Sequence, residues 1–214
     1  MPKGSSKCFD RDGVIKPTSK ARSKARPIKL LGDPILRAPA KPVEKLTKSI
    51  GELIDQMFAS MEAANGVGLA ANQIGVPKRI CVARHAGQTY VLINPEVMWE
   101  SDETEEGVEG CLSIPNVQAV VLRPIRLRVM AYDRDGNRFE IDAEGMLARI
   151  LQHELDHLDG KLIIDRAVEG SLHWVLTQVD DEGNERVVTI PTTPEEVERV
   201  FTEAVSSKMP GHDG

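Results

Sequence analysis

The sequence predicts an α+β protein in which short antiparallel sheets pack around one central helix, with another helix before it and another after it. Apolar residues recur at helical spacing over residues 46–64 and again around residue 150. Short β-rich runs lie between and after these segments, and turn residues separate the members of each pair. Strands joined by such short turns pair antiparallel, so small sheets beside the helices are expected.

The first regular element is a helix over residues 46–64. Its apolar residues are spaced three and four apart and build one wide face: Leu46, Ile50, Leu53, Ile54, Met57, Phe58 and Met61. Asn65-Gly66 is expected to end the helix, because both residues tolerate the left-handed conformation found at helix C-termini.

Strands before the central helix are expected at residues 79–83, 88–93, 118–122, 126–131 and 139–143. The first two form a hairpin around Ala86-Gly87, and the last two form a hairpin around Asp135-Gly136. An acidic connector, residues 100–106, separates the two hairpins.

The central helix is expected to begin at about Glu144 and to end at Gly160. A last hairpin, residues 174–179 and 186–190, follows it. Thr193-Pro194 then starts a C-terminal helix with a capping residue and a first-turn proline.

Composition describes a chain with an aliphatic core and charged tails. Aromatic residues are only 4% of the 214, so the core must rest on aliphatic side chains. The apolar runs are too short to span a bilayer, and no signal peptide is evident. We therefore expect a cytoplasmic location, with neither a membrane nor DNA as partner.

The two ends of the chain are expected to lack structure. Residues 1–26 form a basic leader with eight lysines and arginines against Asp10 and Asp12, and residues 207–214 form a frayed tail. The leader is interpreted as a solvated disordered segment. A polyanion-binding arm and an organelle transit peptide are the alternatives, although the aspartates and the lack of an amphipathic stripe disfavour the transit peptide.

The central helix carries the pattern His153-Glu154-x-x-His157. Residues four apart lie on the same face of a helix, so two imidazoles can close on one metal ion. Glu154 then lies near enough to handle protons at a bound water. A catalytic ion needs a third protein ligand and one open position. The alternative is a solvated polar turn at the end of a helix.

Three cysteines, widely spaced, do not indicate a disulfide framework. Cys8 lies in the leader, and Cys81 lies in an apolar stretch where it is expected to be a small buried residue. Cys111 lies in a glycine-flanked loop, from which its sulfur could turn toward a neighbouring element.

The segment from Gly66 to Gly75 is small and nearly uncharged, and its glycines allow close approach of another backbone. It is either a tight connector or a wall along which a substrate backbone can lie. Gln73 in this segment has a side chain that can both donate and accept hydrogen bonds.

Three segments together resemble the signature motifs of the peptide deformylase family, in its order and at its separations: Gly66–Gln73, Glu109–Ser113 and Gln152–His157. The resemblance extends to about residue 168. The last hairpin and helix are then additions within a single catalytic domain, residues 27–206.

The resemblance implies that Cys111 joins His153 and His157 as the third ligand of one divalent metal ion. A thiolate, two imidazoles and a water make a four-coordinate site with an open position. Ferrous iron is the expected ion, with zinc, nickel and cobalt as alternatives, since the ligands do not settle the choice.

The implied reaction is hydrolysis of the N-formyl group of the initiator methionine on nascent polypeptides, which releases formate. A metal-bound hydroxide would attack the formyl carbon, with Glu154 as general base and then general acid. The side-chain amide of Gln73 and the backbone N–H of Leu112 would stabilise the developing oxyanion.

The N-formyl-methionyl nascent peptide should lie extended as an added strand, with the methionine in an apolar pocket. The resemblance assigns this binding to Gly66, Val67, Gly68, Glu109, Gly110 and Ile150. An arginine common in the family is Gln118 here, and Glu109 is expected to pair with Arg123 at the surface. A transient ribosome contact would use the basic leader, because the C-terminal helix is acidic.

Two other functions use some of the same residues. A zinc endopeptidase would use the helix motif, but Cys111 in its loop disfavours that alternative. A non-catalytic binding protein or a structural metal site predicts loss of Glu154 or Gln73, and both are present.

Overall fold

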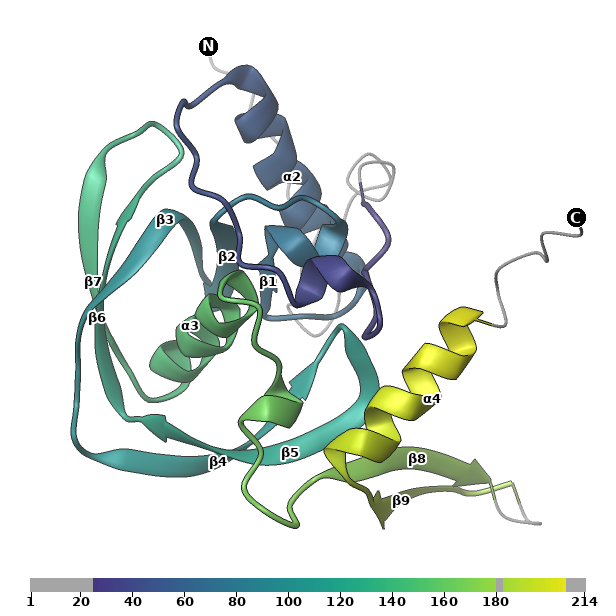
Figure 1. Ribbon diagram of the computed structural model, residues 1–214. Coiled ribbons are helices and arrows are strands. Elements are labelled where there is room, and N and C mark those ends of the chain that lie inside the picture. The colour runs from purple at the N-terminus through teal and green to yellow at the C-terminus, as the bar shows by residue number, and fades with distance from the viewer. Residues whose placement is uncertain (1–24, 180–182, 207–214) are drawn as a thin grey trace, which may run out of the picture.

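The computed structural model describes residues 25–179 and 183–206, with the side chains of residues 204–206 left out (Figure 1). The predictions for the leader up to residue 24, for Cys8 and for the tail from residue 207 lie outside the described residues. Within the described part of the chain, no helix is long and apolar enough to cross a membrane.

Two antiparallel sheets confirm the α+β prediction. The five-stranded sheet has the order β1-β2-β3-β6-β7 and consists of β1 (Gly68–Ala70), β2 (Ile80–His85), β3 (Gln88–Glu100), β6 (Arg126–Tyr132) and β7 (Arg138–Glu144). The four-stranded sheet has the order β4-β5-β8-β9 and consists of β4 (Thr104–Cys111), β5 (Ile114–Pro124), β8 (His173–Val179) and β9 (Glu185–Pro191). Strands β1 and β4 are edge strands of their sheets.

Helix α2 (Lys48–Ala63) covers the β1 end of the five-stranded sheet. Its predicted apolar face is buried at Leu53, Ile54, Met57 and Met61, which pack with residues of β1 and β2 in one core cluster. The helix therefore fixes the position of the segment that follows it, where β1 and the short 3-10 helix η2 (Ala71–Ile74) lie.

Helix α3 (Gly145–Leu158) is the central helix, and both sheets surround it (Figure 1). Leu151 and Leu158 are fully buried in the core against the five-stranded sheet. Gly160 ends the helix as predicted, with φ of +75°. A Cβ at Gly160 would lie 2.5 Å from the carbonyl oxygen of Arg37, so the chain packs tightly there.

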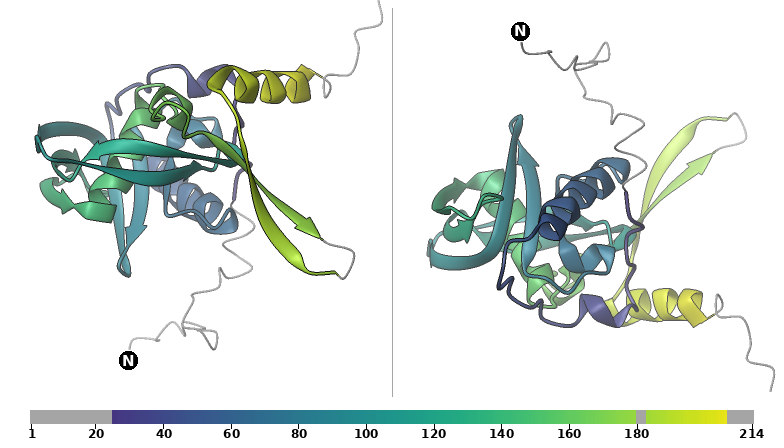
Figure 2. Two further views of the ribbon diagram at one scale, coloured as in Figure 1. Left: turned by 90° about the horizontal axis from the view of Figure 1, so that it is seen from below. Right: turned by 90° about the horizontal axis from the view of Figure 1, so that it is seen from above.

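The C-terminal part contains the predicted hairpin, β8–β9, and helix α4 (Pro194–Ser206). Val197 and Phe201 of α4 are buried, and the Phe201 ring stacks on Trp174 of β8 with 6.2 Å between ring centres. Figure 2 shows the hairpin and the helix extending from the body in different directions. Two further 3-10 helices are η1 (Pro34–Leu36) and η3 (Ile163–Asp165).

Two expectations for irregular segments are wrong. Of the acidic connector, residues 100–106, only residues 101–103 lie between strands, because β3 ends at Glu100 and β4 begins at Thr104. Cys111 ends β4 rather than lying in a loop. Glu105 and Glu106 are exposed while β4 pairs with β5 along its length. Charged residues are common on edge strands, which explains why the run is acidic and still a strand.

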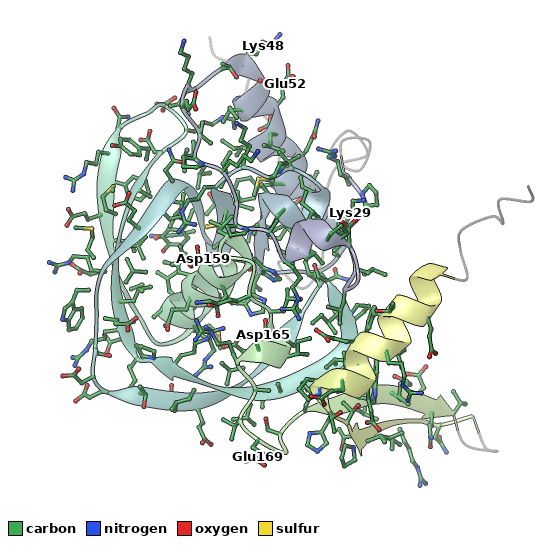
Figure 3. The ribbon with its side chains drawn as sticks, in the orientation of Figure 1. Lys29, Lys48, Glu52, Asp159, Asp165 and Glu169 are labelled. Carbon is green, nitrogen blue, oxygen red and sulfur yellow. The ribbon has the colours of Figure 1, made fainter. Side chains whose placement is uncertain are left out.

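Ion pairs on the outer surface are of the ordinary exposed kind. Lys48 and Glu52 at the start of α2 are one example, with 3.8 Å between Nζ and Oε1 (Figure 3). Asp159, also labelled there, pairs with Arg79 beyond the end of α3. Such pairs contribute about 0–1 kcal/mol each.

Candidate active site

Cys111, His153 and His157 meet where the end of β4 reaches α3. The two histidines lie one helical turn apart, and Cys111 is placed by a register shift that follows Gly110 in the β4–β5 pairing. Cys111 Sγ lies 3.2 Å from His157 Nε2, and one ligand atom from each of the three residues lies within 4.8 Å of the others. The structure therefore brings the three residues together as one candidate metal centre.

The chemistry of these three side chains fits a divalent transition metal. Burial raises the pKa of the Cys111 thiol, but His157 and His153 lower it more, to about 5, so the sulfur is a thiolate at neutral pH. Thiolate is the form in which cysteine binds metals. His157 Nδ1 is buried and has no hydrogen-bond partner within residues 25–179 and 183–206, so its Nε2 is the nitrogen that faces the other ligands.

Glu109 orients the imidazole ring of His153 through a hydrogen bond at Nδ1. His153 Nδ1 lies 2.9 Å from Glu109 Oε2, and since a carboxylate only accepts, Nδ1 carries the hydrogen and Nε2 is left for an ion. Arg123 donates to both Glu109 oxygens at 3.0 Å, and Arg149 Nη1 donates to Oε1 at 2.9 Å. Burial raises the pKa of Glu109, but the hydrogen bonds from His153 and Arg123 bring it down to about 2.

The expectation that Glu109 and Arg123 pair at the surface is therefore wrong. Both side chains are buried, with about 5–6% of each exposed. Alternation along β4 turns Glu109 inward, onto α3, where Arg123 also donates to Asp156 at 2.5 Å. Arg166 closes the network by donating to Asp156 at 2.7 Å. Breaking one partner of such a buried pair typically costs about 3–5 kcal/mol.

Glu154 is the buried carboxylate that this network leaves out. Its Oε2 has no hydrogen-bond partner in the described part of the chain, and burial raises its pKa to about 7. A Cβ on Gly68 would lie 2.2 Å from Glu154 Oε1, so only glycine leaves room for the carboxylate beside β1. A carboxyl group with such a pKa can both take and give a proton near neutral pH.

Gln73, in η2, has its amide fixed on both sides. Its Oε1 accepts from the Ala70 backbone N–H at 2.9 Å, and its Nε2 lies 3.2 Å from Ser113 Oγ and 3.9 Å from Cys111 Sγ. Leu112 lies in the turn between β4 and β5, next to Cys111. Its side chain covers Gly66, where a Cβ would lie 2.7 Å from Leu112 Cδ1.

A cleft of about 700 Å³ opens in front of these groups, between edge strands β1 and β4. Eleven of the twelve candidate site residues line it: Gly66, Val67, Gly68, Gln73, Glu109, Gly110, Cys111, Leu112, Ile150, His153 and Glu154. The twelfth, His157, lies behind them and is 1% exposed.

Several residues near the site were missed from the sequence. Arg149 and Asp156 are buried charges on α3, and their spacing of four and three residues from His153, which places them on its face of the helix, was a usable signal. Val175 and Thr177 of β8 also line the cleft. Strand alternation places them on one face, but it does not say which element that face approaches.

The fold and the site define a metal-binding hydrolase, with a thiolate, two imidazoles and an unpaired carboxylate at the base of an open cleft. The polypeptide deformylase family model matches residues 25–172. The chain belongs to the peptide deformylase family.

Individual relatives agree with this assignment. The peptide deformylase of Bartonella tribocorum is 49% identical over 65% of this chain and 83% of its own length. That of Dictyoglomus thermophilum is 49% identical over 69% of this chain and 95% of its own. The crystal structure of peptide deformylase from Ehrlichia chaffeensis superimposes with a TM-score of 0.65 at 38% identity, over 68% of this chain and 89% of that one.

The chain is therefore an enzyme of a metal-dependent family whose members remove the N-formyl group from nascent peptides. Neither the endopeptidase nor the non-catalytic metal protein accounts for these similarities. The family match ends at residue 172, immediately before β8.

Proposed function

We propose that the enzyme hydrolyses the N-formyl group of the initiator methionine with one divalent ion held by Cys111, His153 and His157. The observation that carries this proposal is Glu154, a buried carboxylate with an unpaired oxygen beside these ligands and at the base of the cleft. Ferrous iron is the proposed ion, and zinc, nickel or cobalt would suit the same donor set.

When bound, the ion would lower the pKa of a water molecule and polarise the formyl oxygen. Glu154 would take the proton of the attacking water as the new C–O bond forms. It would return that proton to the nitrogen of methionine as the C–N bond breaks, which gives formate and a free amine. The carboxylate can do both because no hydrogen bond within the described residues occupies Oε2.

Gln73 and Leu112 are proposed to donate to the oxygen that develops negative charge. Ala70 and Ser113 hold the Gln73 amide in place, so the donor is oriented before the substrate arrives. Preorganised donors of this kind are worth about 3 kcal/mol of the barrier each.

The peptide is proposed to lie extended in the cleft, where both flanking strands offer a free edge. Gly66, Val67 and Gly68 would border it on one side and Glu109 and Gly110 on the other. The side chain of Glu109 is already engaged by His153, Arg123 and Arg149, so its part in binding would be that of its backbone. Val67, Ile150 and His153 would bound the methionine pocket.

Two coarser proposals accompany this mechanism. Residues 27–206 are proposed to act as one catalytic domain. A transient ribosome contact is proposed for the basic leader, since the first turn of α4 carries Glu195 and Glu196.

Formate release from formyl-Met-Ala, by protein purified without oxygen and loaded with ferrous iron, tests this proposal. Glu154→Gln keeps the size of the side chain but cannot accept the proton. We expect it to lower kcat by about 10²–10⁴-fold with the metal content unchanged. Absence of formate with the loaded wild-type protein would contradict the proposal, and cleavage of internal peptide bonds would favour an endopeptidase.

A further inference from the structure

We propose that the β8–β9 hairpin is a specificity wall, which contacts the third and fourth residues of the nascent peptide and favours uncharged, apolar side chains there. This inference rests on the function proposed above. The hairpin lies beyond residue 172, where the family match ends.

The cleft itself supplies the first argument. Val175 and Thr177 line the same 700 Å³ cleft as Cys111 and Glu154, next to Asn116 and Gln118. A formyl-methionine held at the ligands would therefore leave the rest of its peptide in a space that the hairpin borders.

Strand geometry supplies the second argument, because it places the hairpin at a definite distance. Gln118 pairs with Gly110 on one side and with His173 on the other, so β8 lies two strands from β4. Neighbouring strands lie about 4.8 Å apart and a strand rises about 3.3 Å per residue, so Val175, two residues along β8 from His173, lies roughly 12 Å from Gly110. An extended peptide covers that distance in about four residues.

The two faces of the hairpin supply the third argument. On one face, Trp174 stacks on Phe201 of α4, which fixes how the base of the hairpin is turned. Val175 and Thr177 point to the opposite face, where their strand partners are Thr189 and Val187. Val187 is 71% exposed, so an uncharged, β-branched surface is presented to solvent beside the cleft.

The character of this surface decides what it would select. The side chains that line the hairpin end of the cleft, Asn116, Gln118, Val175 and Thr177, are all uncharged. A charged residue placed against them would lose water without gaining an ion pair, whereas an apolar residue would gain contact area.

The test measures kcat/KM for formyl-Met-Ala, which is too short to reach the hairpin, and for three tetrapeptides that continue with Val-Val, Asp-Asp or Lys-Lys. For wild-type enzyme we expect the Val-Val peptide to exceed both charged peptides by about five- to tenfold after normalisation to the dipeptide. Equal values for the three tetrapeptides would overturn the inference.

A matched pair of variants separates the hairpin face from a general charge effect. Thr177→Lys and Gln178→Lys add the same charge at neighbouring exposed positions on opposite faces of β8. Thr177→Lys should raise the Asp-Asp to Lys-Lys ratio by about fivefold, and Gln178→Lys should leave it within twofold of wild type. Equal ratios in the two variants would overturn the inference. If the wild-type enzyme had no activity on formyl-Met-Ala, that result would instead contradict the proposed reaction.

Discussion

The inner and outer walls of the cleft are held in opposite ways. The inner wall, Gly107–Cys111 with Arg149–His157, is fixed by buried hydrogen bonds among Glu109, Arg123 and their neighbours. Within the described residues, the outer wall, the β8–β9 hairpin, pairs with β5 at Val117 and Gln118, and Trp174 of β8 stacks on Phe201 of α4.

This difference follows the demands on each wall. Groups that handle a proton or an ion must keep their positions to a fraction of an ångström, and buried charged hydrogen bonds supply that precision. Under the proposal above, the hairpin would meet many different peptide sequences, and its described contacts with β5 and α4 lie near its base. The predictions below test the two walls in decreasing order of effect.

Cys111→Ser should have the largest effect, because it removes the thiolate from the inner wall. A serine hydroxyl stays protonated at neutral pH and is a poor ligand, so the variant should lose its ion on dialysis against a chelator and release no formate above the metal-free background. Metal analysis and formate release measure this. Cys81→Ala is the control, since Cys81 is also a buried free cysteine but is not one of the clustered candidate ligands, and this variant should keep the ion. A stoichiometric ion in Cys111→Ser would refute the assignment.

Glu109→Gln should have the next effect, because it leaves Arg123 and Arg149 without their shared carboxylate. We expect a loss of about 3–5 kcal/mol in unfolding free energy. Metal affinity should also fall by about 10–100-fold, since His153 loses its orienting partner. Denaturant unfolding and metal titration measure the two changes.

The matched control is Glu52→Gln, which removes one partner of the exposed Lys48–Glu52 pair. It should change the unfolding free energy by no more than about 0.5 kcal/mol. If the two variants proved equally stable, the contrast between buried and exposed pairs would fail.

Trp174→Ala should have the smallest effect, because it loosens only the outer wall. The lost stacking with Phe201 is worth about 0.5–1.5 kcal/mol beyond the area that is uncovered. Amide hydrogen exchange should therefore speed up in β8 and β9 and stay unchanged in α3. Hydrolysis of formyl-Met-Ala should remain within twofold of wild type. A uniform loss of protection across the molecule would show that the hairpin is not held separately.

Much of the fold was predictable from local patterns. Helical spacing gave α2 and α3 to within two residues at each end, and turn residues gave the β2–β3 and β6–β7 hairpins. Strand β4 was missed because Thr104–Gly110 is rich in Glu and Gly, and its extended form comes from pairing with β5 rather than from its own preference.

Part of the candidate site was likewise predictable from the sequence, and part depends on tertiary packing. The sequence motifs named the three candidate ligands, and the fold brings those residues together. The buried position of Arg123 could not be foreseen, because it depends on how β5 crosses α3 and not on neighbouring residues in the chain. The approach of Val175 and Thr177 to the cleft has the same origin.

Helix α3 carries core leucines and candidate ligands on alternate sides of the same few turns, with Leu151 and Leu155 beside His153 and His157. An ion bound there would stabilise the core, because the free energy of metal binding to the folded state adds to the free energy of unfolding. Removing the ion would therefore lower the free energy of unfolding, and thermal unfolding would release the ion. Oxidation of the Cys111 sulfur would then lower the melting temperature of the entire molecule.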